Sequence, residues 1–94
     1  MRVLLSEGVV EFVRSLAPEP RRRVRDALRG LENGQGDIKA LEPPLDAYCR
    51  LRVGGFRIIL AYRPGDTVEC IFVERRGVVY EVLEARIRER IQEP

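Results

Sequence analysis

The chain has 94 residues, of which 45% are hydrophobic and 34% are charged. A compact domain typically has roughly 100 to 150 residues, so we expect a single domain over residues 1–94, and this composition excludes both a disordered chain and a membrane span. The 17 basic and 15 acidic residues give a net charge of +2, and Lys39 is the only lysine.

The composition also excludes several kinds of active site. Without histidine, the chain lacks the commonest general base and metal ligand, so neither a Ser-His-Asp nor a Cys-His site can form. Two cysteines, Cys49 and Cys70, are too few for a thiolate zinc site and too far apart for a redox pair. We therefore expect no metal and no cofactor, and interpret both cysteines as buried strand residues.

The N-terminal apolar stretch is too short for the hydrophobic core of a signal peptide. We therefore expect a cytoplasmic protein whose thiols stay reduced.

The first third of the chain predicts a strand followed by two helices. Residues 2–5 are typical of a short strand, and Ser6 is a good N-cap for a helix whose apolar residues recur at helical spacing up to Pro18. A second helix is predicted from near residues 19–20, with one apolar stripe, and ends at Asn33-Gly34. The two helices form a hairpin with a very short connection.

The apolar period then changes from 3.6 to 2, which indicates strands. Residues 48–53 place 49, 51 and 53 on one face, and Gly54-Gly55 predicts a tight turn into a strand over 56–63. In that strand Phe56, Ile58, Leu60 and Tyr62 are expected to face the core. A central strand over 67–74 and a last helix over about 78–91 complete the order βααβββα. The prediction is an α+β fold, a small mainly antiparallel sheet with the helical hairpin on one face and a C-terminal helix.

Arginines gather on the predicted hairpin, where no acidic residue occurs between Asp46 and Asp66. Arg50, Arg52 and Arg57 are expected on the face away from the core, close together across the turn. Guanidinium groups without a carboxylate neighbour repel one another, which favours an anionic partner. The alternative is an ordinary solvated strand face.

A second basic cluster, Arg75-Arg76, ends the last predicted strand, and Tyr80 follows at the start of the last helix. The helix N-terminus and the arginines suit phosphate binding, and a phenol suits stacking on an exposed base. The alternative is that Tyr80 is a half-buried packing residue.

These segments resemble the RelE/ParE superfamily of toxins from bacterial and archaeal toxin-antitoxin pairs. The resemblance is carried by residues 39–41, by the run 48–59 with its Arg-Leu-Arg-Val-Gly-Gly-Phe-Arg hairpin, by residues 73–76 and by Tyr80, and it extends over essentially the whole chain.

The resemblance implies a basic cleft on the sheet and a cognate antitoxin that covers it. RelE-like members cut mRNA in the ribosomal A site by attack of a 2′-hydroxyl on the adjacent phosphate, whereas ParE-like members inhibit DNA gyrase. By position, the resemblance implies a catalytic set of Arg50, Arg52, Arg57, Arg76 and the stacking Tyr80. We expect the neighbouring basic residues Lys39, Arg63 and Arg75 to contact RNA.

The chain departs from the family pattern where a proton must be moved. Arg50 and Arg52 stand where well-studied RelE members have lysines, and Arg75 stands where many relatives have histidine. Arginine is a poor base, so phosphate binding is well provided and the general base is unidentified; Glu74 is a candidate if it faces the cleft. Ribosome-dependent mRNA cleavage is the favoured interpretation. The alternatives are gyrase inhibition and a catalytically weakened binding module.

Overall fold

The computed structural model describes residues 1–75, 85 and 88–89 of the chain. It contains two helices, α1 (Glu7–Ser15) and α2 (Pro18–Leu31), and five strands: β1 (Arg2–Leu5), β2 (Asp37–Ala40), β3 (Cys49–Val53), β4 (Phe56–Arg63) and β5 (Thr67–Arg75). Arg76 and most of the predicted C-terminal helix, Tyr80 included, lie outside the described residues.

The helices begin and end where the sequence carries the appropriate signals. Ser6 caps α1, since its hydroxyl accepts a hydrogen bond from the Val9 amide at 3.3 Å. Pro18 occupies the first position of α2, where the missing N–H has no intrahelical partner to lose. The predicted helical hairpin is therefore confirmed, with α2 beginning one to two residues earlier than the pattern indicated.

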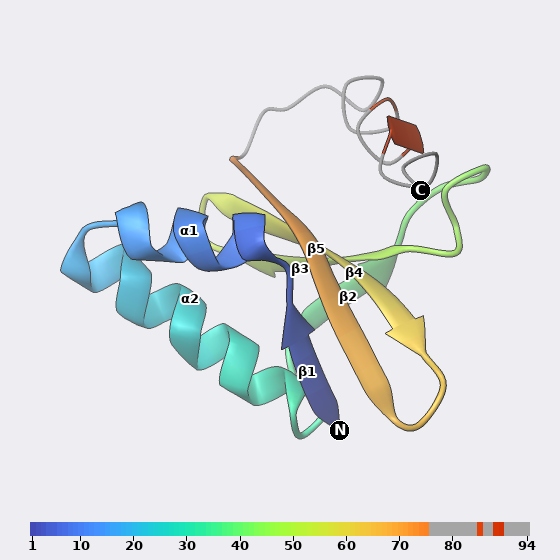
Figure 1. Ribbon diagram of the computed structural model, residues 1–94, viewed down its shortest axis with the longest axis horizontal. Helices are drawn as coiled ribbons and strands as arrows, with labels where there is room; N and C mark the ends of the chain where they lie inside the picture. Colours follow the sequence, from blue (N-terminus) through green and yellow to red (C-terminus); the bar gives the residue numbers. More distant parts are fainter. Residues whose placement is uncertain (76–84, 86–87, 90–94) are drawn as a thin grey trace.

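The five strands form one sheet in the order β1-β5-β4-β3-β2 (Figure 1). β2 to β5 form an antiparallel meander, and β1 pairs in parallel with β5 through the register Val3↔Val68. The α+β class is confirmed, and so is the prediction that β5 is an interior strand, since it lies between β1 and β4. β2 was not predicted, because its four residues carry too weak an alternation to stand out; its partner β3 defines it.

Both helices pack on the same face of the sheet, hereafter the helix face (Figure 1). The core between the helices and the sheet consists of apolar residues from α1 and its C-cap, from α2 and from β3, β4 and β5. All are at most 8% exposed: Val9, Val13, Leu16, Val24, Leu28, Leu31, Leu51, Val53, Ile58, Leu60, Val68 and Cys70. Removal of this apolar surface from water is the main stabilising contribution to the fold. The alternation predicted for β3 is confirmed by Leu51 and Val53.

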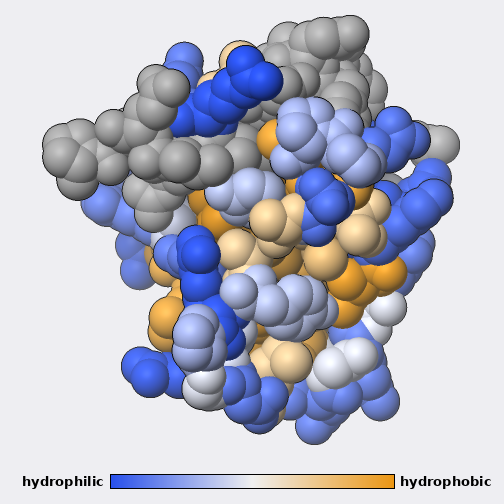
Figure 2. All heavy atoms as spheres, turned by 90° about the vertical axis from the view of Figure 1, so that its right-hand side faces the viewer, coloured by the Kyte–Doolittle hydropathy of each residue, from blue (hydrophilic) through white to orange (hydrophobic). Residues whose placement is uncertain are grey.

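The opposite face, hereafter the open face, carries a second and smaller apolar cluster. Leu45 packs there on Ile59, with Leu41, Tyr48 and Phe72 around them, so the 41–48 connection lies over the middle of the sheet. From the side of this connection, apolar side chains gather centrally with hydrophilic ones around them (Figure 2). The charged residues of the open face therefore lie beside this cluster.

Tyr62 differs from the prediction that placed it in the core, because it is 48% exposed. β3 pairs with β4 only as far as Leu60, so Tyr62 lies beyond the end of β3 and no β3 residue pairs with it.

Candidate functional site

Two rows of charged residues cross the open face at the end of the β3–β4 hairpin. The strand register places Lys39 opposite Arg50 in the first row. In the second row Arg52 lies opposite both Asp37 and Arg57, and Arg57 lies opposite Glu74. Directly opposed residues have Cβ atoms about 5 Å apart, so the structure brings these side chains together.

The predicted absence of carboxylates around the arginines is wrong. Asp37 of β2 and Glu74 of β5 end the second row on either side, and Glu74 is 7% exposed. The acid-free stretch of sequence is real, but the neighbouring strands come from elsewhere in the chain and bring their own acids. The candidate carboxylate Glu74 does face the open side, next to Arg57.

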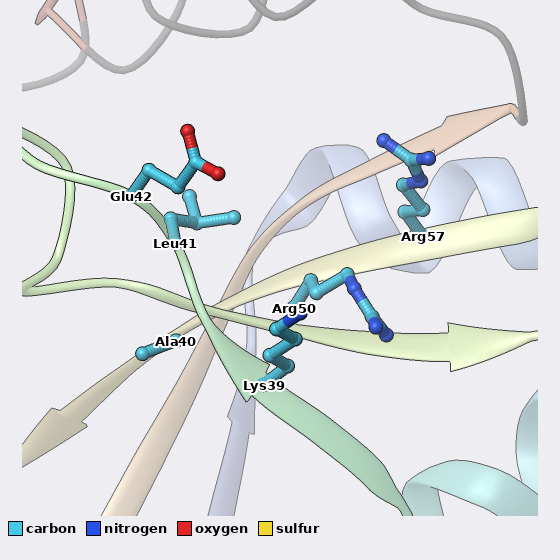
Figure 3. A pocket seen from close by; sticks show the side chains of 6 residues that line it. All are labelled: Lys39, Ala40, Leu41, Glu42, Arg50 and Arg57. Atoms are coloured by element: carbon cyan, nitrogen blue, oxygen red, sulfur yellow. The ribbon is translucent and has the colours of Figure 1, made fainter.

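Four of the six residues that line a pocket of about 330 Å³ on this face are charged: Lys39, Glu42, Arg50 and Arg57. Ala40 and Leu41 complete the wall. Figure 3 shows Glu42 and Arg57 on opposite sides of the pocket, with Lys39 and Arg50 between them. The three cations come from three adjacent strands, β2, β3 and β4.

Arg50 is held in place, whereas its neighbours are not. Its Nη1 donates to the Asp37 carbonyl at 3.4 Å and lies 3.8 Å from the Asp37 carboxylate, and its side chain is only 19% exposed. Within the described part of the chain, the side chains of Lys39, Arg52 and Arg57 form no hydrogen bond or ion pair. These three cations are therefore available to bind an anion.

Two other predicted RNA contacts lie elsewhere. Arg63 is on the open face but forms an ion pair with Glu69 at 2.9 Å, six residues along β4 from Arg57 and hence roughly 20 Å away. Arg75 is on the helix face, with its guanidinium carbon 5.6 Å and 5.4 Å from the ring centroids of Phe12 and Phe56. Such a position stabilises the end of β5 by cation–π attraction. Arg76 and Tyr80 are outside the described residues.

Glu42 is the pocket residue that sequence reasoning missed. It follows β2 by two residues, in a connection whose path over the open face no local pattern revealed. One available signal was its position three residues after the only lysine, which was itself a predicted contact.

Among the described residues no group of three or more potential ligands is arranged to hold a metal ion. None of the helices in that part of the chain is long and apolar enough to cross a membrane. The pocket itself offers ammonium and guanidinium groups beside one carboxylate, and these cations suit the binding of an anion.

The fold is shared with solved toxin structures. The chain matches the RelB-RelE antitoxin-toxin complex of Methanococcus jannaschii with a TM-score of 0.65 and 24% identity, over 84% of this chain and 96% of that one. It matches the YoeB/ParE toxin of Agrobacterium tumefaciens with a TM-score of 0.63 and 16% identity, over 81% and 99% of the two chains.

A third match is the RelBE2 toxin-antitoxin complex of Mycobacterium tuberculosis, with a TM-score of 0.61 and 20% identity over 80% and 96% of the two chains. No protein-family model matches the sequence, and no curated protein matches it significantly. By its architecture, the chain has the RelE/ParE-like toxin fold that its arginine hairpin implied.

Proposed function

We propose that this chain is the toxin of a toxin-antitoxin pair and that it cuts mRNA on the ribosome. The observation that carries the proposal is the pocket on the open face, where Lys39, Arg50 and Arg57 converge from three strands of a fold shared with RelE and YoeB toxins. Its volume of about 330 Å³ is within the usual range for small-ligand sites, and its cations suit a phosphodiester.

The reaction is attack of a ribose 2′-hydroxyl on the adjacent phosphorus, which forms a 2′,3′-cyclic phosphate and releases a 5′-hydroxyl. Negative charge accumulates on the phosphoryl oxygens in the transition state, so fixed cations lower the barrier. Arg50, held by Asp37, is preorganised for this role, and Arg57 and Arg52 add charge from the same face. Arg76 and Tyr80 belong to the proposed site by resemblance.

The first prediction concerns Arg57. In a reconstituted translation system, wild-type protein is expected to cut mRNA in the ribosomal A site, which mapping of new 5′ ends detects. Arg57→Gln removes a cation that contacts the transition-state phosphoryl group, so we expect the cleavage rate to fall about 10²-fold to 10³-fold.

Arg22→Gln is the matched control, because Arg22 is exposed on α2 and lies on the other side of the sheet. It is expected to leave the rate unchanged. Intact mRNA with saturating wild-type protein would rule out the nuclease function, and equal rates for the two variants would remove Arg57 from the site.

We also propose a cognate antitoxin as partner. Two of the matched structures, those from Methanococcus jannaschii and Mycobacterium tuberculosis, are toxin-antitoxin complexes. Co-expression of this chain with the product of the adjacent reading frame is expected to yield a stable complex and to suppress any growth arrest.

The second candidate is inhibition of DNA gyrase. It is favoured by the lack of histidine and by Arg50 and Arg52, which stand where well-studied RelE members have lysines, since a non-nuclease inhibitor needs no base. Loss of supercoiling activity of purified gyrase on addition of the protein, with mRNA left intact, supports this candidate; unchanged supercoiling rejects it.

A further inference from the structure

The proposed reaction depends on where Arg57 stands, because a cation stabilises the phosphoryl group only when it is correctly placed beside it. Resting on the proposed nuclease function, we propose that Arg75 is a positioning residue for Arg57. Arg75 acts from the helix face through its contacts with Phe12 and Phe56, and these three residues are hereafter the Arg75 cluster. Arg75 was expected from the sequence to contact RNA, so this role differs from that prediction.

The Arg75 cluster joins α1 to the last pair of the β4–β5 ladder. Phe56 and Arg75 are opposite each other in that pair, and Phe56 also ends the pairing of β4 with β3. The Phe12 ring meets the Phe56 ring edge-on, with centroids 5.7 Å apart and an angle of 80° between the planes. The Arg75 guanidinium carbon is 5.6 Å and 5.4 Å from these two centroids. Both rings pack against the main core, which anchors the cluster to the helix face.

The alternation of side chains along the strands carries this anchoring to the open face. Phe56 and Arg57 are neighbours in β4 and point to opposite faces, as Arg75 and Glu74 do in β5. Arg57 and Glu74 form the next pair of the ladder. Figure 3 shows Arg57 projecting from β4 at one side of the pocket. A cluster that holds the pair of Phe56 and Arg75 therefore also holds the backbone of Arg57, one residue away.

This end of the sheet is where an anchor has most effect. The last pairs of a ladder open more easily than its middle. On the open face Arg52 lies opposite Arg57, and directly opposed like charges destabilise a strand pair. The Arg57 side chain forms no hydrogen bond or ion pair within the described part of the chain, so its position depends on its backbone. Attraction between the Arg75 guanidinium and two rings opposes the opening from the other face of the sheet.

The effect of Arg75 on the reaction is indirect. The described residues that line the pocket come from β2, β3, β4 and the connection after β2, and none of them belongs to β5. Because the guanidinium is on the helix face, the sheet lies between Arg75 and a phosphate bound by Arg57. A change at Arg75 therefore reaches that phosphate through the position of Arg57.

The first measurement tests the structural step by amide hydrogen exchange under native conditions. Arg75→Met keeps a long apolar side chain and removes the guanidinium, and Phe12→Leu removes one of the two rings. In both variants, exchange of the amides that pair residues 56–57 with 74–75 is expected to accelerate about tenfold or more, with little change in the middle of the ladder. Arg22→Met, at an exposed arginine of α2, is the matched control and is expected to leave exchange unchanged.

The second measurement is the single-turnover rate of mRNA cleavage on programmed ribosomes with saturating folded protein, which separates the chemical step from binding. Arg75→Met and Phe12→Leu are each expected to lower this rate about tenfold, since a misplacement of about 1 Å can cost about 10²-fold. Arg75→Lys keeps a cation near the rings and is expected to recover part of the rate. Arg22→Met is expected to cleave like wild type.

A double variant distinguishes positioning of Arg57 from a general weakening of the fold. In the Arg57→Gln background the guanidinium that Arg75 positions is absent, so adding Arg75→Met is expected to change the rate by less than about twofold. A general loss of folded structure would instead lower the rate by the same factor in both backgrounds.

The outcomes separate this inference from the proposed function. Wild-type protein that leaves mRNA intact overturns both. If wild type cleaves, unchanged exchange in Arg75→Met, or a rate within about threefold of wild type, overturns the positioning role alone. A slow Arg75→Met beside a fully active Phe12→Leu shows that Arg75 contacts RNA directly, and equal losses in the two backgrounds show that Arg57 is not involved. Either of these results also overturns the positioning role.

Discussion

At the scale of single residues, the near-absence of lysine acquires a meaning that composition alone does not convey. The chain has one lysine among 17 basic residues, and it lies in the pocket opposite Arg50. Arginines bind phosphate through a planar set of donors but do not release a proton, whereas lysine does. The strand next to the hairpin thus provides the ammonium group that the hairpin lacks.

The residue with the clearest pH signature lies in the core. Burial raises the pKa of the Cys70 thiol from 9.0 to about 12, with a smaller contribution from the nearby Glu69 charge. A thiol whose pKa is raised on folding stays protonated in the native state while the unfolded chain ionises. Its contribution to stability is therefore complete below pH 9 and is lost as the pH rises towards 12.

We accordingly expect the free energy of unfolding of the wild type, relative to Cys70→Ala, to shrink between pH 9 and pH 12. Urea titrations over this range measure the difference, in which other titrating groups cancel. Cys49→Ala serves as the control, since Cys49 is only partly buried and burial raises its pKa less. A pH-independent difference for Cys70→Ala would contradict the burial of this thiol.

At the scale of elements, Ser6 joins the start of α1 to an irregularity in β5. Ile71 is the extra residue in β5, because Ile59 pairs with Phe72 and Leu60 with Cys70. The Ser6 hydroxyl donates to the Ile71 carbonyl at 2.8 Å and accepts from the Val9 amide, and the Ser6 amide donates to the Cys70 carbonyl at 3.0 Å. One side chain therefore satisfies a helix amide and a bulge carbonyl.

Ser6→Ala is expected to lower the free energy of unfolding by about 1 to 2 kcal/mol, because the cap is lost and the Ile71 carbonyl loses its partner. Denaturant unfolding provides the measurement. Ser15→Ala, at the other end of α1, is the control: its hydroxyl donates to the Phe12 carbonyl in an exposed position, and we expect a change below 0.5 kcal/mol. Equal losses would show that the link to β5 contributes nothing.

β2 is a strand whose own sequence pattern is weak and whose pairing with β3 determines its position. Gly36 precedes it with a φ of 138°, and a Cβ there would lie 2.7 Å from Leu51 Cδ1, so glycine is needed where the chain meets β3. The following residues then pair with β3 from Asp37 to Ala40. This pairing carries Lys39 to the pocket.

At the scale of the whole molecule, the two faces of the sheet differ in what they carry. The helix face carries the main apolar core, and Arg75 lies there against two phenylalanine rings. The open face carries the pocket and three cations, Lys39, Arg52 and Arg57, whose side chains form no hydrogen bond or ion pair among the described residues. The proposed nucleic-acid binding is therefore expected to depend on the charges of the open face.

This division predicts how the proposed RNA binding depends on salt concentration. For a single-stranded oligonucleotide, each phosphate contact contributes about −0.7 to the slope of log K against log salt concentration. Arg57→Gln is expected to reduce the slope by about this amount, and Arg22→Gln on α2 to leave it unchanged. Fluorescence anisotropy at several salt concentrations measures both, and identical slopes for the two variants would contradict binding on the open face.

By itself, the sequence determined the α+β class, the two helices and the arginine hairpin, because caps, turn glycines and apolar periods act over a few residues. Alternation within β3 and β4 also assigned Arg50, Arg52 and Arg57 to one face. The tertiary structure decided what stands beside them: β2 with Asp37 and Lys39, the turn with Glu42, and Glu74 of β5.

It also decided that Arg75 lies on the helix face and that Arg63 lies near Glu69, away from the pocket. The physical reason is that strand pairing joins segments distant in sequence, and the register, shifted by one residue at Ile71, determines which side chains meet. A local pattern states which face a residue takes within its own strand, whereas the neighbours that make that face a site come from the packed sheet.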